Sequence, residues 1–210
     1  MAADAELQDL LGFFTRPTLI SRGSLLATPG NIYTFEAGWG GFLTEVPMWA
    51  DRLRGVRGIR GDLVFTIEHN ANPFHQGVLV GAFQHGDRQF RRHDKPSMCT
   101  HVPHVRLDIS EFTRAELRVP YLNELEYWGN STSEAGHVNG RFSLVQLLGT
   151  PALAGSNIPV YKLFVHLENP QVFGRMPLAG TTFVVPQAGV SVAEKELAAN
   201  GQLSGVLATA

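Results

Sequence analysis

The sequence predicts an all-β protein in which two antiparallel sheets face each other. Three observations support this prediction: apolar and polar residues alternate with period two in several segments, helix signals are few, and Gly, Pro, Asn and Ser cluster between those segments. The chain has 210 residues, and all-β chains of this length are commonly single domains. Hydrophobic residues make up 44% of the chain, which supplies a substantial core and excludes a wholly disordered protein.

The strands are predicted from the alternation itself. In Leu63–Glu68, the apolar Leu63, Phe65 and Ile67 occupy every second position, as in a strand with one buried face. Val78–Phe83 is nearly all apolar and therefore predicts a strand that is covered on both faces. Further predicted strands are Pro17–Leu26, Asn31–Glu36, Val105–Ile109, Ala115–Tyr121, Phe142–Leu148, Tyr161–Leu167 and Thr181–Val185.

Two short helices are predicted. Glu45–Leu53 allows a helix of two turns, because Pro47 is tolerated in a first turn. Ser191–Ala199 is the second, ended by Asn200 and Gly201. About eight strands separated by long, uneven loops predict an eight-stranded antiparallel jelly-roll β-sandwich with one or two short helices and extended termini.

The two ends of the chain differ from its middle. We expect an N-terminal arm over residues 1–30, a jelly-roll domain over 31–186 and a C-terminal tail over 187–210. The arm carries Phe13 and Phe14 with little charge, so it either folds back on its own barrel or packs on a neighbouring molecule.

Charge and hydropathy exclude several classes. The formal net charge of −2 excludes a protein that coats nucleic acid through its net charge. Charged residues are 17% of the chain, below the usual quarter or so, which fits either a partner-covered surface or a neutral monomer. We see no secretory signal and no apolar run long enough to span a membrane.

The histidines are the main candidates for a metal site. A cupin-like metal enzyme would use His69, His75 or His104, but the chain lacks a His-x-His pair. Loop histidines that bond to backbone or water are the alternative. Cys99 is the single cysteine, so no intramolecular disulfide forms, and no Gly-x-Ser-x-Gly elbow is present. We therefore predict no catalytic residue, cofactor or metal, and hence no enzyme.

Aromatic and basic residues leave two binding functions open. Trp39, Trp49 and Trp128 could bind sugar in a lectin-like sandwich, or they could pack in a core or an interface. Arg52, Arg54 and Arg57 belong to a basic run that could contact phosphates. The alternative for this run is a solvated loop or an interface that forms ion pairs.

Five blocks of sequence resemble capsid proteins of picorna-like viruses (order Picornavirales), which are small icosahedral positive-strand RNA viruses. The blocks lie in order between residues 13 and 170: Phe14-Thr15-Arg16-Pro17, Asn70–Gly77 with its Phe-His-Gln-Gly step, Pro103-His104, Val119-Pro120-Tyr121 and Glu168-Asn169-Pro170. The Asp-Asp-Phe element that some precursors of this group carry for self-cleavage does not occur here, so that activity is not carried over.

The resemblance implies a structural function. It implies a capsid subunit that assembles with two similar jelly-roll subunits, and with copies of itself, into a pseudo-T=3 icosahedral shell enclosing an RNA genome. Such a subunit is made and assembled in the host cytoplasm and resides in the virion. On this interpretation Phe13, Phe14, Arg16 and Trp49 are candidates for subunit contacts, and Arg52, Arg54 and Arg57 for contacts with RNA.

Overall fold

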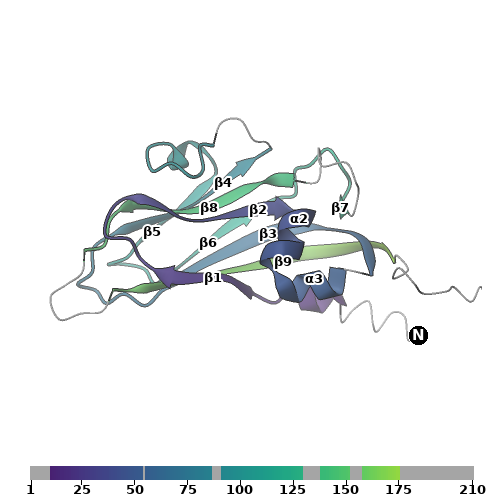
Figure 1. Cartoon of the computed structure of the whole chain (residues 1–210), viewed down its shortest axis with the longest axis horizontal. Coiled ribbons are helices and arrows are strands. Elements are labelled where there is room, and N and C mark those ends of the chain that lie inside the picture. Colours follow the sequence, from purple (N-terminus) through teal and green to yellow (C-terminus); the bar gives the residue numbers. More distant parts are fainter. Residues whose placement is uncertain (1–9, 54, 87–90, 130–137, 152–157, 176–210) are drawn as a thin grey trace, which may run out of the picture. The chain divides into compact units, whose positions relative to one another are not determined.

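The computed structural model describes residues 10–53, 55–86, 91–129, 138–151 and 158–175 (Figure 1). Within these residues the strands form two antiparallel sheets. The first sheet has the order β1-β9-β3-β6, with the short β7 paired to the start of β3, and the second has the order β2-β8-β4-β5. Because consecutive strands mostly lie in different sheets, the chain crosses between the layers repeatedly, and the predicted jelly-roll sandwich is confirmed.

The strand bounds are close to those expected from the alternation. The first sheet contains β1 (Thr18–Ser24), β9 (Val160–Arg175), β3 (Val56–His69), β6 (Arg114–Val119) and β7 (Trp128–Gly129). The second contains β2 (Gly30–Gly38), β8 (Val138–Leu148), β4 (Val78–His85) and β5 (His104–Asp108). The predicted strand Thr181–Val185 and the predicted helix Ser191–Ala199 lie outside the described residues.

The core lies between the two sheets and follows the predicted face of β3. Leu63, Phe65 and Ile67 are fully buried and belong to the main core cluster. Val64 and Thr66 on the other face are buried as well, so the prediction of a single buried face is wrong for this central part of the strand. The ring of Phe65 stacks on that of Phe142 from β8, with 4.2 Å between centroids, so the inner faces of the two sheets meet there. Period-two alternation therefore identified the side of this strand that forms the core.

The second sheet is also covered on its outer face. Val80, Ala82 and Val145 form a small apolar cluster there with Cys99, which belongs to the 3-10 turn η1 (Cys99–His101). The cover explains why β4 is apolar at nearly every position, and it confirms the prediction of a strand buried on both faces. Cys99 is buried, and burial raises the pKa of its thiol, so it serves as a packing residue.

The helix predicted over Glu45–Leu53 is present, and a second helix that the sequence did not predict precedes it. The unpredicted helix is α2 (Trp39–Glu45), and the predicted one is α3 (Pro47–Leu53), which begins directly after the C-cap residue Val46 of α2. Gly40 and Gly41 lower the helix propensity of this segment, so propensity alone does not predict α2. Gly41 is nevertheless required, because a Cβ there would lie 1.9 Å from the carbonyl oxygen of Glu36. No helix in the described part of the chain is long and apolar enough to cross a membrane.

Part of the expected N-terminal arm belongs to the barrel. Residues 10–14 are helical, and β1 is paired with β9 from Thr18↔Val165 to Ser24↔Val160. Phe14 is fully buried in the main core cluster. Of the two alternatives for this segment, residues 10–24 adopt the one in which it folds back on its own barrel, so the barrel begins before residue 31.

Candidate subunit-contact surface

One end of the barrel encloses the aromatic residues that the sequence offered as contacts. Around α2 and α3, the rings of Phe14 and Phe42 each lie 5.4 Å from that of Trp49, and Phe42 lies 5.0 Å from Trp128. The indole nitrogen of Trp49 donates a hydrogen bond to Thr18 Oγ1 at 3.2 Å. We call these residues, Phe14, Phe42, Trp49 and Trp128, the helix end. Phe14 and Trp49 are fully buried inside the chain, so in this conformation neither offers surface to a neighbour.

The other predicted contact residues lie at the edge of the helix end. Phe13 is half-buried, and its ring packs edge-on against Phe14 with 5.5 Å between centroids. The guanidinium of Arg52 lies 5.3 Å above the Phe13 ring, in a cation–π contact. Arg16 and Arg57 are exposed, and Arg54 lies outside the described residues. The structure therefore places Arg52 against Phe13, a contact that the sequence did not predict. The expected contacts of Phe13 and Arg16 with subunits, and of the other arginines with RNA, stay predictions.

The tryptophans and the histidines of the described residues do not form the alternative sites. Trp39, Trp49 and Trp128 are all buried, so they present no aromatic platform for a sugar. Within the described residues, no three His, Cys, Asp or Glu side chains come together as metal ligands. His69 accepts a hydrogen bond from the Ala71 amide on Nδ1 and donates one from Nε2 to the Phe112 carbonyl at 2.7 Å. These findings give the cupin-like and lectin-like alternatives no support.

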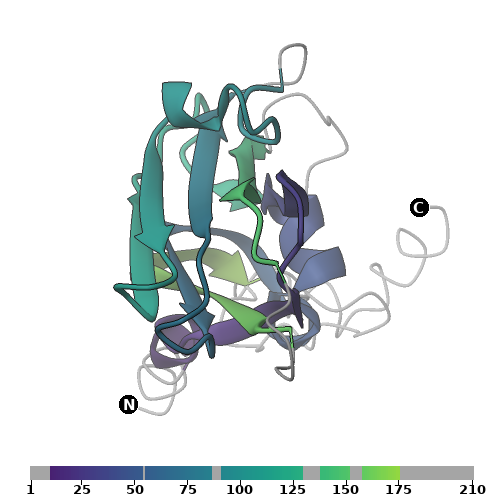
Figure 2. The same cartoon turned by 90° about the vertical axis from the view of Figure 1, so that its left-hand side faces the viewer.

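The opposite end of the barrel is built from loops tied together by hydrogen bonds, and Figure 2 views the molecule from this side. The bonds join the β1–β2, β3–β4, β5–β6 and β8–β9 connections. We call these four connections together the loop end. They are Leu25 N to Pro159 O (2.9 Å), Thr150 N to Leu26 O (2.8 Å), Asn70 N to Val160 O (3.1 Å), His69 N to Thr113 O (3.1 Å) and Ile109 N to Gly77 O (3.1 Å). Backbone groups that would otherwise face water are thus shared between loops.

The Asn70–Gly77 segment holds its phenylalanine outward. The side-chain oxygen of Asn72 accepts the Phe74 amide at 3.1 Å and lies 2.6 Å from Nδ1 of His75. His75 is buried, whereas Phe74 is 81% exposed. At the end of the segment, a Cβ on Gly77 would lie 2.3 Å from Thr150 Oγ1, so only glycine lets the loops approach this closely. The motif therefore forms a fixed turn that presents an aromatic ring to solvent.

Phe74 is joined at the loop end by other exposed apolar side chains. Phe112 is 59% exposed, Leu148 52% and Ile158 48%. The sequence analysis did not identify these residues as contacts. A signal was present, because Phe74 follows Asn72-Pro73 and precedes His75-Gln76-Gly77 in a loop, where a large aromatic has no alternating partner to cover it.

Comparison with known proteins gives the context for this geometry. The chain matches no model of a known protein family. It is 23% identical over 172 residues to the structural polyprotein of Cricket paralysis virus, a match that covers 79% of this chain and 19% of that polyprotein. The chain thus spans about a fifth of the length of this relative.

Solved virus structures share the architecture. A chain of the Triatoma virus empty capsid superposes with a TM-score of 0.66 at 22% identity, covering 80% of this chain and 95% of that one. A chain of black queen cell virus superposes with a TM-score of 0.67 at 19% identity, covering 80% and 73%. The chain has a virus capsid fold. The predicted resemblance to capsid proteins of picorna-like viruses is confirmed. The loop end and the helix end lie at opposite ends of this sandwich (Figure 1).

Proposed function

We propose that the chain is a structural capsid subunit of a picorna-like virus and not an enzyme. The loop end carries this proposal: four large apolar side chains, Phe74, Phe112, Leu148 and Ile158, are about half or more exposed on hydrogen-bonded loops. An isolated soluble protein gains nothing from holding such groups in water, whereas a subunit buries them against its neighbours. The capsid fold and the match to a structural polyprotein support the same function.

In this proposal the subunit assembles with two similar jelly-roll subunits and with copies of itself into a pseudo-T=3 shell. Closed symmetric shells repeat a few contacts many times, so each contact can be modest while the particle is stable. We further propose that the shell encloses an RNA genome and that assembly takes place in the host cytoplasm. Arg57 and Arg52, together with Arg54, remain the proposed contacts with RNA, and Arg57 is the exposed member on β3.

The test is the composition and size of native particles that contain this chain. We expect sedimentation and negative-stain imaging to show uniform virus-sized particles. Protein and nucleic-acid analysis should then find two partner chains of similar size and RNA. A native 23 kDa monomer with no such particles would contradict the proposal.

The N-terminal arm needs a truncation that respects the core. Deleting residues 1–20 would remove Phe14 from the core and the start of β1, so the loss of assembly could reflect unfolding. Deleting residues 1–9 leaves both in place. If the arm contacts a neighbour, this shorter deletion should lower the yield of particles while the melting temperature of the isolated chain stays unchanged.

A further inference from the structure

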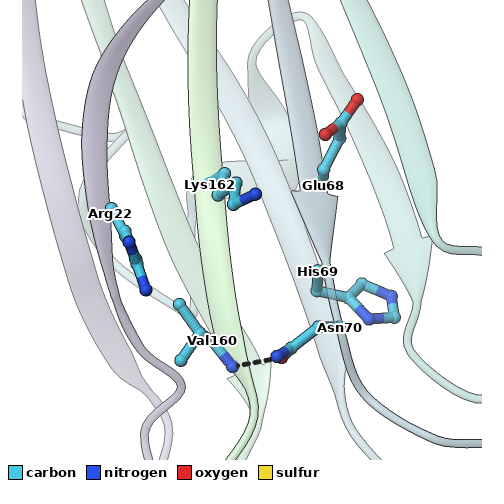
Figure 3. A pocket seen from close by; sticks show the side chains of 6 residues that line it. All are labelled: Arg22, Glu68, His69, Asn70, Val160 and Lys162. Carbon is cyan, nitrogen blue, oxygen red and sulfur yellow. Dashed lines mark hydrogen bonds between the residues drawn. The ribbon is translucent and has the colours of Figure 1, made fainter.

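A cavity of about 230 Å³ opens on the outer face of the first sheet, beside the loop end (Figure 3). It is lined by Arg22 from β1, Lys162 and Val160 from β9, and Glu68, His69 and Asn70 at the end of β3. Apart from Asn70, which begins the Asn70–Gly77 motif, these residues belong to none of the sequence motifs described above. Its position next to exposed apolar loops raises the question of what it binds.

Two cations line this cavity from neighbouring strands, Arg22 from β1 and Lys162 from β9, and the Lys162 side chain extends toward β3 (Figure 3). Strand register places Arg22 directly opposite Lys162, and like charges in that arrangement destabilise a sheet. Within the described part of the chain, neither side chain forms an ion pair or a hydrogen bond. Glu68 lies opposite Lys162 in the β3–β9 register, but the ion pair it forms is with Arg114 on β6, at 3.9 Å. Arg114 in turn lies closer to Glu116, at 2.5 Å, so Arg22, Lys162 and Arg114 face two carboxylates and one positive charge is in excess.

The remaining polar groups of the cavity do not supply a counter-charge. Asn70 Oδ1 accepts the Val160 amide at 2.7 Å, which leaves the Asn70 side-chain nitrogen as a donor. The His69 ring points away from Arg22 and Lys162 (Figure 3), and its two nitrogens are engaged by Ala71 and Phe112. The uncommitted groups are thus donors, which fits an anionic ligand.

The surroundings favour a single carboxylate over the phosphates of a nucleic acid. Along the same face of the first sheet stand the acidic Glu116, paired with Arg114 at 2.5 Å, and Glu168, paired with Arg118 at 3.3 Å. A phosphate chain that extended from the cavity across this face would meet these carboxylates. The apolar lining residue Val160 lies two residues after the exposed Ile158 of the loop end, and apolar groups beside the cavity suit a protein partner.

We propose that Arg22 and Lys162 bind a carboxylate side chain that a neighbouring capsid subunit inserts into this cavity. This inference rests on the proposed function and gives the loop-end contact a specific polar anchor next to its apolar part. An Arg and a Lys together bind a carboxylate by charge-assisted hydrogen bonds, and a charge pair of this kind sets the register between partners as well as the affinity. The neighbour is expected to carry an exposed Glu or Asp beside an apolar side chain.

The first experiment tests whether the cavity binds a carboxylate in the isolated full chain. Thermal unfolding is compared in sodium acetate and in sodium chloride at equal ionic strength, with acetate as the carboxylate probe. We expect acetate to raise the melting temperature of the natural chain, and the double variant R22Q/K162Q to lose most of that rise. Arg106→Gln, a change at an exposed arginine of the second sheet, is the matched control and should keep it. An equal rise in the double variant would overturn the proposal.

The second experiment tests whether the cavity residues contribute to particle assembly. R22E/K162E should lower particle yield about tenfold or more, because it replaces attraction for the incoming carboxylate with repulsion, whereas Arg106→Glu should lower it much less. Unchanged yield would overturn the proposal, as would normal particles with reduced RNA, which would assign the anion to a phosphate. If the natural chain forms no particles, the proposed function fails, and the acetate experiment still tests the cavity.

Discussion

The helix end and the loop end use aromatic residues in opposite ways. At the helix end, Phe42 of α2 and Trp49 of α3 are fully buried against each other's rings, whereas at the loop end Phe74 is 81% exposed. The loop end is closed by backbone hydrogen bonds between short connections, and no described segment lies over its phenylalanine. Aromatic residues at the helix end therefore stabilise the fold, and those at the loop end are available for partners.

The largest effect on stability is expected from truncating a buried aromatic side chain at the helix end. Trp49→Ala should lower the free energy of unfolding by about 3–5 kcal/mol, because it leaves a cavity between Phe14 and Phe42 and removes the hydrogen bond from the indole nitrogen to Thr18 Oγ1. Denaturant titration measures this loss. The neighbouring Met48 is 60% exposed, so Met48→Ala should change the free energy by no more than about 0.5 kcal/mol. Equal effects of the two changes would refute the contrast between buried and exposed positions.

The second effect concerns the hydrogen bonds that fix the loop end. Gln146 is fully buried, accepts the Leu26 amide at 2.6 Å and donates to Thr150 Oγ1 at 2.8 Å. Gln146→Ala should cost about 1–3 kcal/mol, since it leaves buried polar groups without partners. Gln171→Ala on β9, where the side chain is exposed, is the control and should be nearly neutral. A neutral Gln146→Ala would mean that water replaces the lost bonds.

A pH-dependent effect is expected at the start of the Asn70–Gly77 loop. Burial lowers the pKa of His69, although its hydrogen bond to the Phe112 carbonyl acts in the opposite direction. The folded chain thus binds a proton at His69 less readily than the unfolded chain does. The stability from neutral His69 is fully present above about pH 6.5, the ordinary pKa of histidine, and is lost progressively as the pH falls below it.

Protonation of Nδ1 would also remove the hydrogen bond from the Ala71 amide, which holds the loop that carries Phe74. Melting temperatures measured between about pH 8 and pH 5 should fall with acid, and less steeply in His69→Gln. Burial also lowers the pKa of His85, His93 and His166, so part of the slope should remain in this variant. A His69→Gln profile parallel to that of the natural chain would exclude His69 as a contributor.

The smallest effect on stability, and the sharpest test of the contrast, is expected at Phe74. Phe74→Ala should change the free energy of unfolding by no more than about 0.5 kcal/mol, because the ring is mostly in water. In assembly the same change should lower particle yield about tenfold, as expected for an aromatic contact residue. A loss of folding stability comparable to that of Trp49→Ala would show that Phe74 is part of the core.

Much of the barrel could be predicted from local patterns, and the exceptions have identifiable causes. The strand predicted over Tyr161–Leu167 continues to Arg175, because the pairing with β3 resumes after an irregularity between Arg60 and Asp62. Asn169 adopts a positive φ of 51° there, and Pro170 lacks an amide hydrogen, so the local sequence indicates an end to the strand. Pairing with a long partner strand overrides that local signal.

The candidate contacts were harder to predict than the strands. Phe14 and Trp49 were expected at subunit interfaces, and the structure places them in the chain's own core. Core and interface both bury apolar area, so composition does not separate them. Phe74 occurs in the very motif that indicated the capsid resemblance, yet its outward orientation depends on contacts with Asn72 and His75 that only the folded turn provides.

The sequence by itself determined the all-β class, the side of β3 that faces the core and the two-sided burial of β4, because the pleat of a strand converts a period of two directly into faces. Tertiary structure decided which aromatic residues are covered and which cations lie together. Arg22 and Lys162 are 140 residues apart, and only the pairing of β1 with β9 makes them neighbours. Such juxtapositions depend on which strands pair and in what register, and that choice is made by the packing of the whole sandwich.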